Sequence, residues 1–292
     1  MIQYDFVRPA NIRDVSLLLA SKPGRSKIIA GGTDLLVQLR EESRELQALE
    51  LVIDLTALTN ELAVIKEDGD AIVIGALVTH HMAEHDALIQ KNFPHLSAAC
   101  ASVGSTQIRH LGTLAGGVCN GSPAADHVPA LIACDTTVMI HGKNGTRETP
   151  MREFCARIGQ DALANDEFVT GFRVQKLPEH ARTGFAKIGR RKALAISRLN
   201  AAVVVLSDDD GLIESARIAP GCIFRVPDRV TAAENSLAGK YISQDAFAEA
   251  AEAVCREMIA RTGYRWSTPY KEIAVKAVVT DALCHATGLE VF

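Results

Sequence analysis

The sequence lacks the features that mark several large classes of protein. It contains no apolar run close to the roughly 18 residues that a membrane-spanning helix needs, and the segment Met1–Pro9 does not resemble a signal peptide. Its 31 lysine and arginine residues are outnumbered by 35 aspartate and glutamate residues, so the net charge is −4 and no basic surface for nucleic acid is indicated. We therefore expect a cytoplasmic protein with no membrane span and no nucleic-acid partner.

Cysteine and histidine patterns typical of metal sites are also missing. The seven cysteines are odd in number, scattered and never spaced as Cys-x-x-Cys, which favours reduced, mostly buried thiols over a disulfide framework. None of the histidines shows metal-ligand spacing with a second ligand, and His80 with His81 is expected at the start of a helix. We therefore expect no metal ion bound by this chain; metal or iron–sulfur ligation by the cysteines is the alternative that stays open.

Among the features present, the segment Ile28–Leu35 is the one around which the chain is organised. It starts at the end of a short apolar strand, is broken by Gly31 and Gly32, and continues into an apolar helix, with Thr33 and Asp34 where an N-cap oxygen is wanted. A strand, a glycine turn and a helix start direct successive backbone N–H groups into one concavity, which binds phosphate without lysine or arginine. The segment contains neither cation, so we predict a phosphate-binding nest; the alternative is an ordinary strand-to-helix turn.

The order of expected strands and helices indicates an α+β chain with three parts. Residues 1–60 show a strand–loop–helix–strand order, as in a small α/β subdomain. Residues 61–176 contain two β-hairpins with turns at Asp68-Gly69 and Asn144-Gly145, together with short helices. Residues 177–292 contain a third hairpin and then two helices. We therefore predict domain boundaries near residues 60 and 176.

A second glycine-rich segment runs from Ser102 to Asp126. Its glycines indicate a backbone held close to another group, and its threonine, asparagine and serine side chains offer uncharged hydrogen bonds. The carboxylate of Asp126 can accept hydrogen bonds from ribose hydroxyls. Two separate glycine-rich segments suit a long ligand with two halves, such as a dinucleotide, better than a simple nucleotide; the alternative is a crowded crossing of two loops. The residues concerned are Gly112, Thr113, Gly116, Gly117, Asn120, Gly121 and Ser122.

Several stretches of sequence, taken in their order and spacing, resemble the FAD-binding medium subunit of the molybdenum hydroxylases. They are the AGGTD loop from Ala30, the QIRHLGT run from Gln107, the glycine turn that follows it, the position of Asp126, and the FAKIGRRKALAISRLN segment from Phe185. Xanthine, nicotinate and carbon monoxide dehydrogenases contain such subunits, and the xanthine dehydrogenase type is the most similar. The resemblance covers essentially the whole chain. It implies a two-subdomain FAD-binding fold of the vanillyl-alcohol-oxidase (PCMH) kind, followed by a C-terminal α/β domain like that of the carbon monoxide dehydrogenase flavoprotein.

The resemblance also implies which residues contact FAD. The segment Ile28–Leu35 would hold the pyrophosphate, and Thr113–Gly117 would form the second FAD segment. Lys187 would lie near the isoalloxazine ring, where a cation stabilises the anionic reduced flavin. Arg190 and Arg191 would bind an NAD phosphate, bind a partner subunit or face the solvent. The full implied set is Ile28, Ile29, Ala30, Gly31, Gly32, Thr33, Asp34, Leu35, Val103 (upstream of the second segment), Thr113, Leu114, Ala115, Gly116, Gly117, Asn120, Asp126 (adenosine side), Val169 (flavin lining) and Lys187.

The second FAD segment departs from the usual pattern of the family at two positions. That pattern is Thr, then either Ile or Leu, then Gly, Gly and Asn. The segment Thr113–Gly117 instead reads Thr-Leu-Ala-Gly-Gly. Ala115 is tolerable only if its φ angle is negative, because a Cβ atom is strained at positive φ. Gly117 removes a side-chain amide, and Asn120, three residues on, is expected to supply part of the missing hydrogen bonding.

These features favour an electron-transfer subunit of a molybdenum hydroxylase. The resemblance implies a molybdopterin-binding large subunit that hydroxylates the substrate and a small subunit with 2Fe-2S clusters, so the molybdenum cofactor and the clusters lie only in partner subunits. FAD in this chain would pass electrons to NAD+ or another acceptor, and we expect no catalytic acid, base or nucleophile here. One alternative is a self-sufficient FAD-dependent oxidoreductase of the vanillyl-alcohol-oxidase or enolpyruvyl-glucosamine-reductase kind. Another is a flavin-free assembly module.

Overall fold

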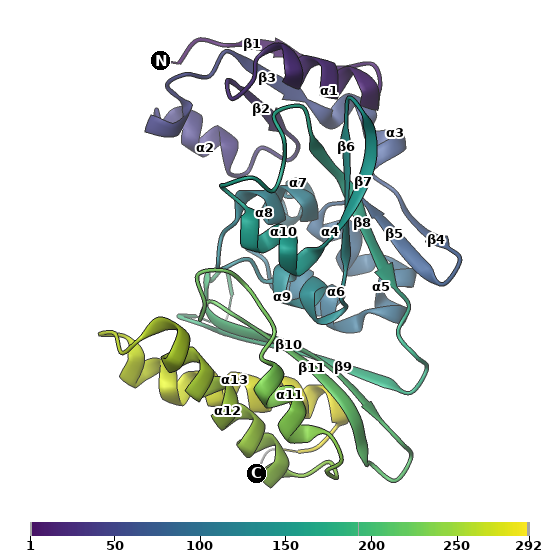
Figure 1. Cartoon of the computed structure of the whole chain (residues 1–292), viewed down its shortest axis with the longest axis vertical. Helices are drawn as coiled ribbons and strands as arrows, with labels where there is room; N and C mark the ends of the chain where they lie inside the picture. The colour runs from purple at the N-terminus through teal and green to yellow at the C-terminus, as the bar shows by residue number, and fades with distance from the viewer. Residues whose placement is uncertain (1, 192, 291–292) are drawn as a thin grey trace. The chain divides into compact units, whose positions relative to one another are not determined.

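The structure is a computed structural model that describes residues 2–191 and 193–290 (Figure 1). The described residues form two compact units, each assembled from separate stretches of the chain. The first unit contains residues 2–82, Thr106–Gly121 and Thr137–Val174, and the second contains Ala83–Ser105, Ser122–Thr136 and residues 175–191 and 193–290. In these described ranges, no helix combines the length and the apolar character that crossing a membrane requires.

The first unit begins with a small parallel sheet that follows the expected strand–loop–helix–strand order. Its elements are β1 (Asp5–Val7), α1 (Ile12–Ser21), β2 (Ser26–Ile29), α2 (Leu35–Arg40), η1 (Arg44–Leu46), β3 (Leu51–Asp54), η2 (Leu55–Leu58) and α3 (Thr59–Leu62). The strand order is β1-β3-β2, and both pairings are parallel. All four residues of the central strand β3 are buried, and Val15 and Leu19 of α1 pack with it in one apolar cluster. Leu51 and Ile53 belong to this cluster, whereas Val52 packs in a second apolar cluster with Leu46 and Leu49.

A five-stranded sheet with short helices makes up most of the rest of the first unit. Its elements are β4 (Ile65–Asp68), β5 (Ala71–Gly75), α7 (Thr106–Leu111), α8 (Leu114–Asn120), β6 (Thr137–Gly142), β7 (Gly145–Pro150), α10 (Met151–Arg157) and β8 (Phe168–Gln175). The strand order is β4-β5-β8-β6-β7, and the hairpins β4–β5 and β6–β7 turn at the predicted positions. Gly69 has φ +60° and Gly145 has φ +114°, values that a residue with a Cβ atom rarely adopts. The two glycines therefore explain where these hairpins turn.

The second unit is built on an antiparallel sheet with the strand order β11-β10-β9 (Figure 1). Its elements are α5 (Ala87–Asn92), α6 (Pro94–Ala101), α9 (His127–Ala133), β9 (Ala181–Gly189), β10 (Ser197–Ser207), β11 (Ile213–Gly221), α11 (Thr231–Leu237), α12 (Gln244–Thr262) and α13 (Thr268–Thr287). Along β10, Val203 and Val205 join the apolar core that includes residues of α12 and α13, and the intervening Ala202 and Val204 are also fully buried. Because successive strand side chains point to opposite faces, this sheet is covered on both sides.

The helices α6 and α9 pack in the second unit, although they lie within the range predicted for the middle subdomain. The three sheets fall in the three predicted ranges, 1–60, 61–176 and 177–292. All seven residues of α9 are buried, and this helix contacts β10 and β11, while α6 contacts β9. An apolar helix of this kind has to be covered, so it packs where the third sheet offers an apolar face. The compact units therefore interleave along the chain.

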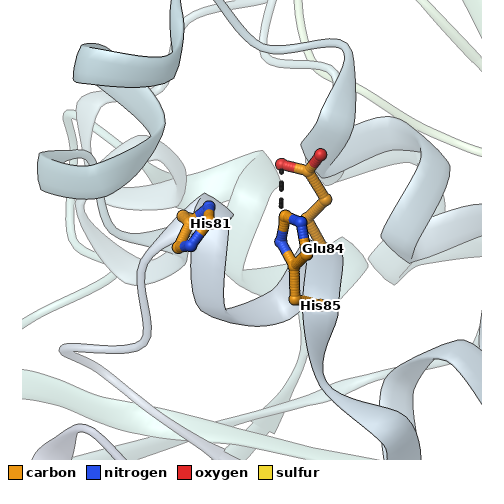
Figure 2. Close-up of side chains that lie close together, drawn as sticks. All are labelled: His81, Glu84 and His85. Atoms are coloured by element: carbon orange, nitrogen blue, oxygen red, sulfur yellow. Dashed lines mark ion pairs between the residues drawn. The ribbon is translucent and has the colours of Figure 1, made fainter.

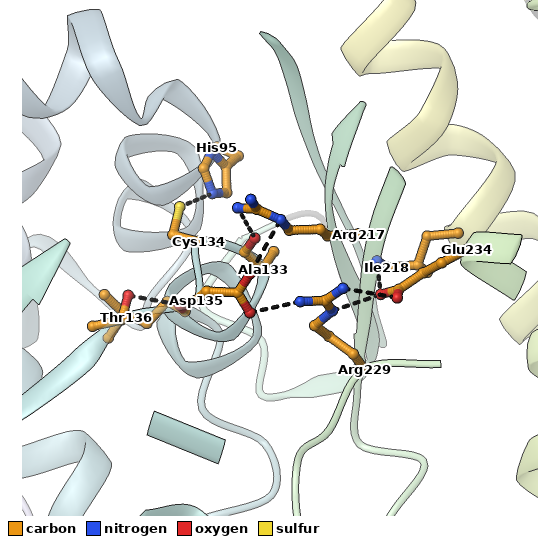
Figure 3. A network of polar contacts seen from close by, with 10 residues as sticks. His95, Ala133, Cys134, Asp135, Thr136, Arg217, Ile218, Arg229 and Glu234 are labelled. Carbon is orange, nitrogen blue, oxygen red and sulfur yellow. Dashed lines mark hydrogen bonds and ion pairs between the residues drawn. The ribbon is translucent and has the colours of Figure 1, made fainter. Parts of the chain in front are cut away.

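A polar network ties α9 to its neighbours in the second unit (Figure 3). Asp135, just after α9, accepts a hydrogen bond of 2.6 Å from Arg229 and forms an ion pair of 3.2 Å with Arg217 of β11. Arg229 also donates to Glu234 of α11 at 2.7 Å, and the Glu234 carboxylate accepts from the Ile218 N–H at 2.9 Å. Hydrogen bonding to Glu234 and the charge of Asp135 raise the pKa of Arg229, so its guanidinium stays charged and links α9, β11 and α11.

Candidate functional site

The segment Ile28–Leu35 forms the predicted turn between a strand and a helix, β2 and α2. The Leu36 N–H donates to the Gly32 carbonyl at 3.0 Å, and Gly32 has φ +68°, a left-handed value that suits glycine. Within residues 2–191 and 193–290, the N–H groups of Gly32, Thr33 and Asp34 donate to no acceptor. A pyrophosphate group is held by backbone donors of this kind, so the segment fits the predicted nest.

The two glycine-rich segments, far apart in the sequence, meet in the first unit. The backbone of Gly31 approaches Leu111 so closely that a Cβ atom at Gly31 would lie 1.8 Å from the Leu111 carbonyl oxygen. At the same junction, the Asn120 side-chain amide donates to the Asp34 carboxylate at 3.1 Å. The structure therefore brings the two segments together, as one ligand that contacts both requires.

The second segment is the start of a helix, whereas the sequence suggested a glycine turn. The helix α8 begins at Leu114, and the Thr113 hydroxyl caps it by accepting from the Gly116 N–H at 3.0 Å. Ala115 lies in the first turn of α8 and is not among the residues with positive φ, so the condition for tolerating its Cβ atom is met. Gly121 ends the helix with φ +66°, so the fold alone accounts for this glycine.

Replacing Asn120 with alanine is expected to weaken FAD binding by up to about tenfold. The Asn120 amide holds Asp34, beside the unpaired N–H groups, against the second segment. Losing one net hydrogen bond costs roughly 0.5–1.5 kcal/mol, and about 1.4 kcal/mol corresponds to a tenfold change in affinity. The variant Gly117→Asn, which restores an amide nearby, is expected to bind FAD equally well or more tightly. Fluorescence titration of the deflavinated chain measures both variants; undiminished affinity in Asn120→Ala would contradict this role.

In the second unit, the carboxylate of Asp126 forms an ion pair with Lys187. The Lys187 ammonium donates to this carboxylate at 2.6 Å and to the Ser102 carbonyl at 2.8 Å. The carboxylate also accepts hydrogen bonds from the Asn200 amide at 2.9 Å and from the Ser197 hydroxyl. The side chains of Lys187 and Asp126 are only 14% and 6% exposed. The pair is therefore buried, and the Asp126 carboxylate has three side-chain donors.

The resemblance implies separate FAD contacts for the two members of this ion pair. Those contacts are the adenosine side for Asp126 and the isoalloxazine ring for Lys187, two ends that the pyrophosphate separates in an extended FAD. The charged atoms of the two residues lie 2.6 Å apart, and both FAD contacts stay predictions. Ser197 and Asn200 were not predicted as partners of Asp126, although both lie within the FAKIGRRKALAISRLN segment.

The two remaining implied contacts, Val103 and Val169, are apolar residues of different units. Val169 is a residue of β8, is 5% exposed and pairs with Ile140 of β6. Val103 follows α6 and is half-buried, and its N–H donates to the Cys100 carbonyl at 3.1 Å. Val169 therefore has an apolar neighbour, and Val103 is bonded to a residue close to it in the sequence. The flavin roles of both valines stay predictions.

A buried cysteine and a buried histidine lie next to each other in the second unit, and these residue types can serve as a catalytic nucleophile and its general base (Figure 3). The His95 Nε2 atom lies 3.2 Å from the Cys134 sulfur. Burial lowers the pKa of His95 to about 4 and raises the pKa of the Cys134 thiol to about 12. Both groups are therefore neutral near pH 7, and this thiol is not an activated nucleophile. Five of the seven cysteines are buried and all seven are free, in agreement with the expected state of the thiols.

A cluster of possible metal ligands on α4 (His80–His85) was missed by the sequence analysis (Figure 2). His81, Glu84 and His85 each offer one ligand atom, and these atoms all lie within 4.8 Å of one another. The expectation that no histidine has metal-ligand spacing with a second ligand is therefore wrong. The spacing His-x-x-Glu-His places the three side chains on one helical face, and this was the available signal. The predicted helix start at His80 is confirmed.

Comparison with known proteins relates both parts of the chain to flavoproteins. Residues 2–176 match the family described as the FAD binding domain in molybdopterin dehydrogenase, and residues 185–286 match the CO dehydrogenase flavoprotein C-terminal domain. The nicotinate dehydrogenase FAD-subunit of Eubacterium barkeri is 33% identical over 249 residues, which cover 84% of this chain and 83% of that protein. The xanthine dehydrogenase FAD-binding subunit of Escherichia coli O157:H7 is 28% identical over 296 residues, which cover 98% of this chain and 99% of that protein.

A solved structure has the same fold over nearly the whole chain. Carbon monoxide dehydrogenase from Hydrogenophaga pseudoflava, in a form that lacks the Mo-pyranopterin moiety of the molybdenum cofactor, matches with a TM-score of 0.89 and 25% identity over 99% of both chains. This match and the two family matches confirm the expected α+β architecture, a FAD-binding part followed by a C-terminal flavoprotein domain. The chain therefore belongs to the family of FAD binding domains in molybdopterin dehydrogenases, and it is an FAD-binding subunit of the molybdenum hydroxylase type.

Proposed function

We propose that this chain is the subunit through which electrons leave a molybdenum hydroxylase complex. A molybdopterin-binding large subunit would hydroxylate the substrate, a small subunit with 2Fe-2S clusters would relay the electrons, and this chain with its FAD would deliver them to NAD+ or another acceptor. The names of two relatives, a nicotinate dehydrogenase FAD-subunit and a xanthine dehydrogenase FAD-binding subunit, support a place in a dehydrogenase with several subunits.

The contact between the two glycine-rich segments is the observation that carries this proposal. Bound FAD supplies reversible uptake of electrons, and this chain holds and orients it. Gly31 lets the first segment reach the backbone of the second, at Leu111. The N–H groups of Gly32, Thr33 and Asp34 would hold the pyrophosphate. These donors belong to the backbone, so the site tolerates the altered side chains of the second segment.

The side chains of the described residues support a division of labour between subunits. In residues 2–191 and 193–290, the buried cysteine–histidine pair is neutral, and the Asp126–Lys187 pair is engaged in its own hydrogen bonds. Neither is available as an acid, base or nucleophile toward a substrate. We therefore assign hydroxylation to the molybdenum-containing partner.

Isolated, FAD-loaded chain is expected to be reduced by NADH but not by a purine, an aldehyde or nicotinate. The reason is that the flavin can exchange electrons with a nicotinamide directly, whereas oxidation of the other compounds requires the partner subunits. The measurement is anaerobic bleaching of the visible flavin absorbance, with purified complex as the positive control. Bleaching of the metal-free isolated chain by one of these substrates would support the self-sufficient oxidoreductase, and a chain that never binds flavin would support the assembly module.

The cellular location and the domain boundaries belong to the same proposal. The seven free cysteines suit the reducing cytoplasm, where disulfides are rare. The family matches over residues 2–176 and 185–286 support a boundary near residue 176. The first sheet ends at Asp54 and the next begins with β4 at Ile65, which supports a boundary near residue 60.

A further inference from the structure

We propose that His81, Glu84 and His85 form a binding site for a divalent transition-metal ion of the Zn²⁺ class. All three side chains come from the short helix α4, at positions i, i+3 and i+4 (Figure 2). Each offers one ligand atom, and these atoms lie within 4.8 Å of one another. Around a tetrahedral Zn²⁺ with bonds of about 2.0–2.1 Å, ligand atoms are roughly 3.4 Å apart.

The composition of the cluster selects the kind of ion. Two imidazoles and one carboxylate are the ligands of catalytic and accessory zinc sites, whereas Mg²⁺ and Ca²⁺ prefer oxygen ligands alone. The Glu84 carboxylate lies 4.0 Å from His85 Nδ1, so an anion already adjoins the imidazole that the ion would bind. The Glu84 side chain is 19% exposed and that of His85 is 59% exposed. The ion therefore has a partly buried carboxylate to bind and an open route from solvent.

The helix that carries these ligands is held at its start. The Met82 N–H donates to the Thr79 hydroxyl at 3.2 Å, and the His80 N–H donates to the Gly112 carbonyl at 3.0 Å. The His81 ring stacks on the ring of His110, with 3.7 Å between their centroids. A ligand whose ring is already oriented loses less conformational freedom when it binds an ion. The start of α4 is also bonded to Gly112, directly before the second FAD segment, so a bound ion would stabilise the helix that this segment rests on.

Calorimetric titration of the untagged, FAD-loaded, chelator-treated full chain with zinc chloride tests the proposal. One ion is expected to bind per chain, and an equal concentration of magnesium chloride is expected to produce no binding. His85→Ala and Glu84→Gln are each expected to lower the affinity for Zn²⁺ at least about tenfold. Because His85 is exposed, His85→Ala should remain folded, which circular dichroism and retention of FAD would check.

Two control variants separate this site from ordinary zinc binding at a protein surface. His180→Ala removes another exposed histidine near a carboxylate, 3.8 Å from Glu214, and Cys119→Ser removes a free thiol of α8. Both are expected to leave the affinity unchanged. The proposal is overturned if the parent chain binds no Zn²⁺, if His85→Ala binds it as tightly as the parent, or if either control abolishes binding. Since the titration measures the ion and not flavin reduction, its outcome is independent of the proposed electron-transfer role.

Discussion

Replacing Gly31 with alanine is expected to lower the affinity for FAD at least about a hundredfold, or about 2.7 kcal/mol, in a chain that still folds. The added Cβ atom would lie 1.8 Å from the Leu111 carbonyl oxygen. A backbone oxygen cannot rotate away as the end of a flexible side chain can, so the two glycine-rich segments have to separate. The unpaired N–H groups of the first segment and the residues of the second segment would then no longer contact the same ligand. Flavin content after purification and fluorescence titration with FAD measure the effect.

A matched pair of variants separates this clash from backbone strain. Gly24 and Gly32 have φ angles of +69° and +68°, so alanine at either position carries a similar strain of about 1–2 kcal/mol. No atom lies within 4 Å of a Cβ atom at Gly24, and the nearest atom to one at Gly32 would be the end of the Leu36 side chain at 3.1 Å, which can move aside. Gly24→Ala should therefore lose stability and keep FAD, whereas Gly32→Ala strains the backbone whose N–H groups would hold the pyrophosphate and should lose FAD. A Gly31→Ala chain with full flavin occupancy would show that the junction is not part of the FAD site.

The second large effect is expected at the buried ion pair: Asp126→Ala should lower the free energy of unfolding by about 3–5 kcal/mol. The variant leaves the Lys187 ammonium, only 14% exposed, with the Ser102 carbonyl but without its counter-ion. It also removes the acceptor of the Ser197 hydroxyl and the Asn200 amide. Buried donors without acceptors add to the cost of the unpaired charge. Urea denaturation followed by circular dichroism measures the change.

A double-mutant cycle and an exposed pair provide the controls for this prediction. Combining Asp126→Ala with Lys187→Met should cost less than the sum of the two single changes, because the double variant leaves no unpaired buried charge. The Lys276–Glu252 pair has a similar ion-pair geometry at 3.1 Å, but its side chains are 42% and 44% exposed. Glu252→Ala is therefore expected to cost much less than Asp126→Ala. Equal costs for Asp126→Ala and Glu252→Ala would contradict a special role for burial.

Features that depend on a few neighbouring residues could be predicted from the sequence. The hairpin turns at Asp68-Gly69 and Asn144-Gly145 are where the structure has them, because positive φ at glycine is a local property. The strand-to-helix turn around Gly32 was predicted for the same reason. The order of motifs, read as a resemblance, indicated a flavin subunit, and the family matches confirm it.

The possible metal ligands of α4 were not predicted, although their spacing is present in the sequence. The His-x-x-Glu-His pattern on α4 was visible in the sequence, yet its meaning depends on the segment being helical over all of His80–His85. A strand would have pointed His81 and Glu84 to opposite faces, whereas 3.6 residues per turn place them with His85 on one face. Since a helix start at His80 was expected, the pattern could have been recognised from the sequence.

The contacts that define the candidate site were decided only by the tertiary structure. Gly31 meets Leu111, Asp34 meets Asn120, and Asp126 meets Lys187, and each pair is far apart in the sequence. Local turns and helix caps say where a segment bends, but not which distant segment covers it. That choice follows from the burial of large apolar faces, such as the fully buried α9 and the two covered faces of β10, in competition with the entropy of closing the chain between them. The sequence by itself therefore determined the class of cofactor and the local shape of each segment. The packing of those faces decided which residues share a site.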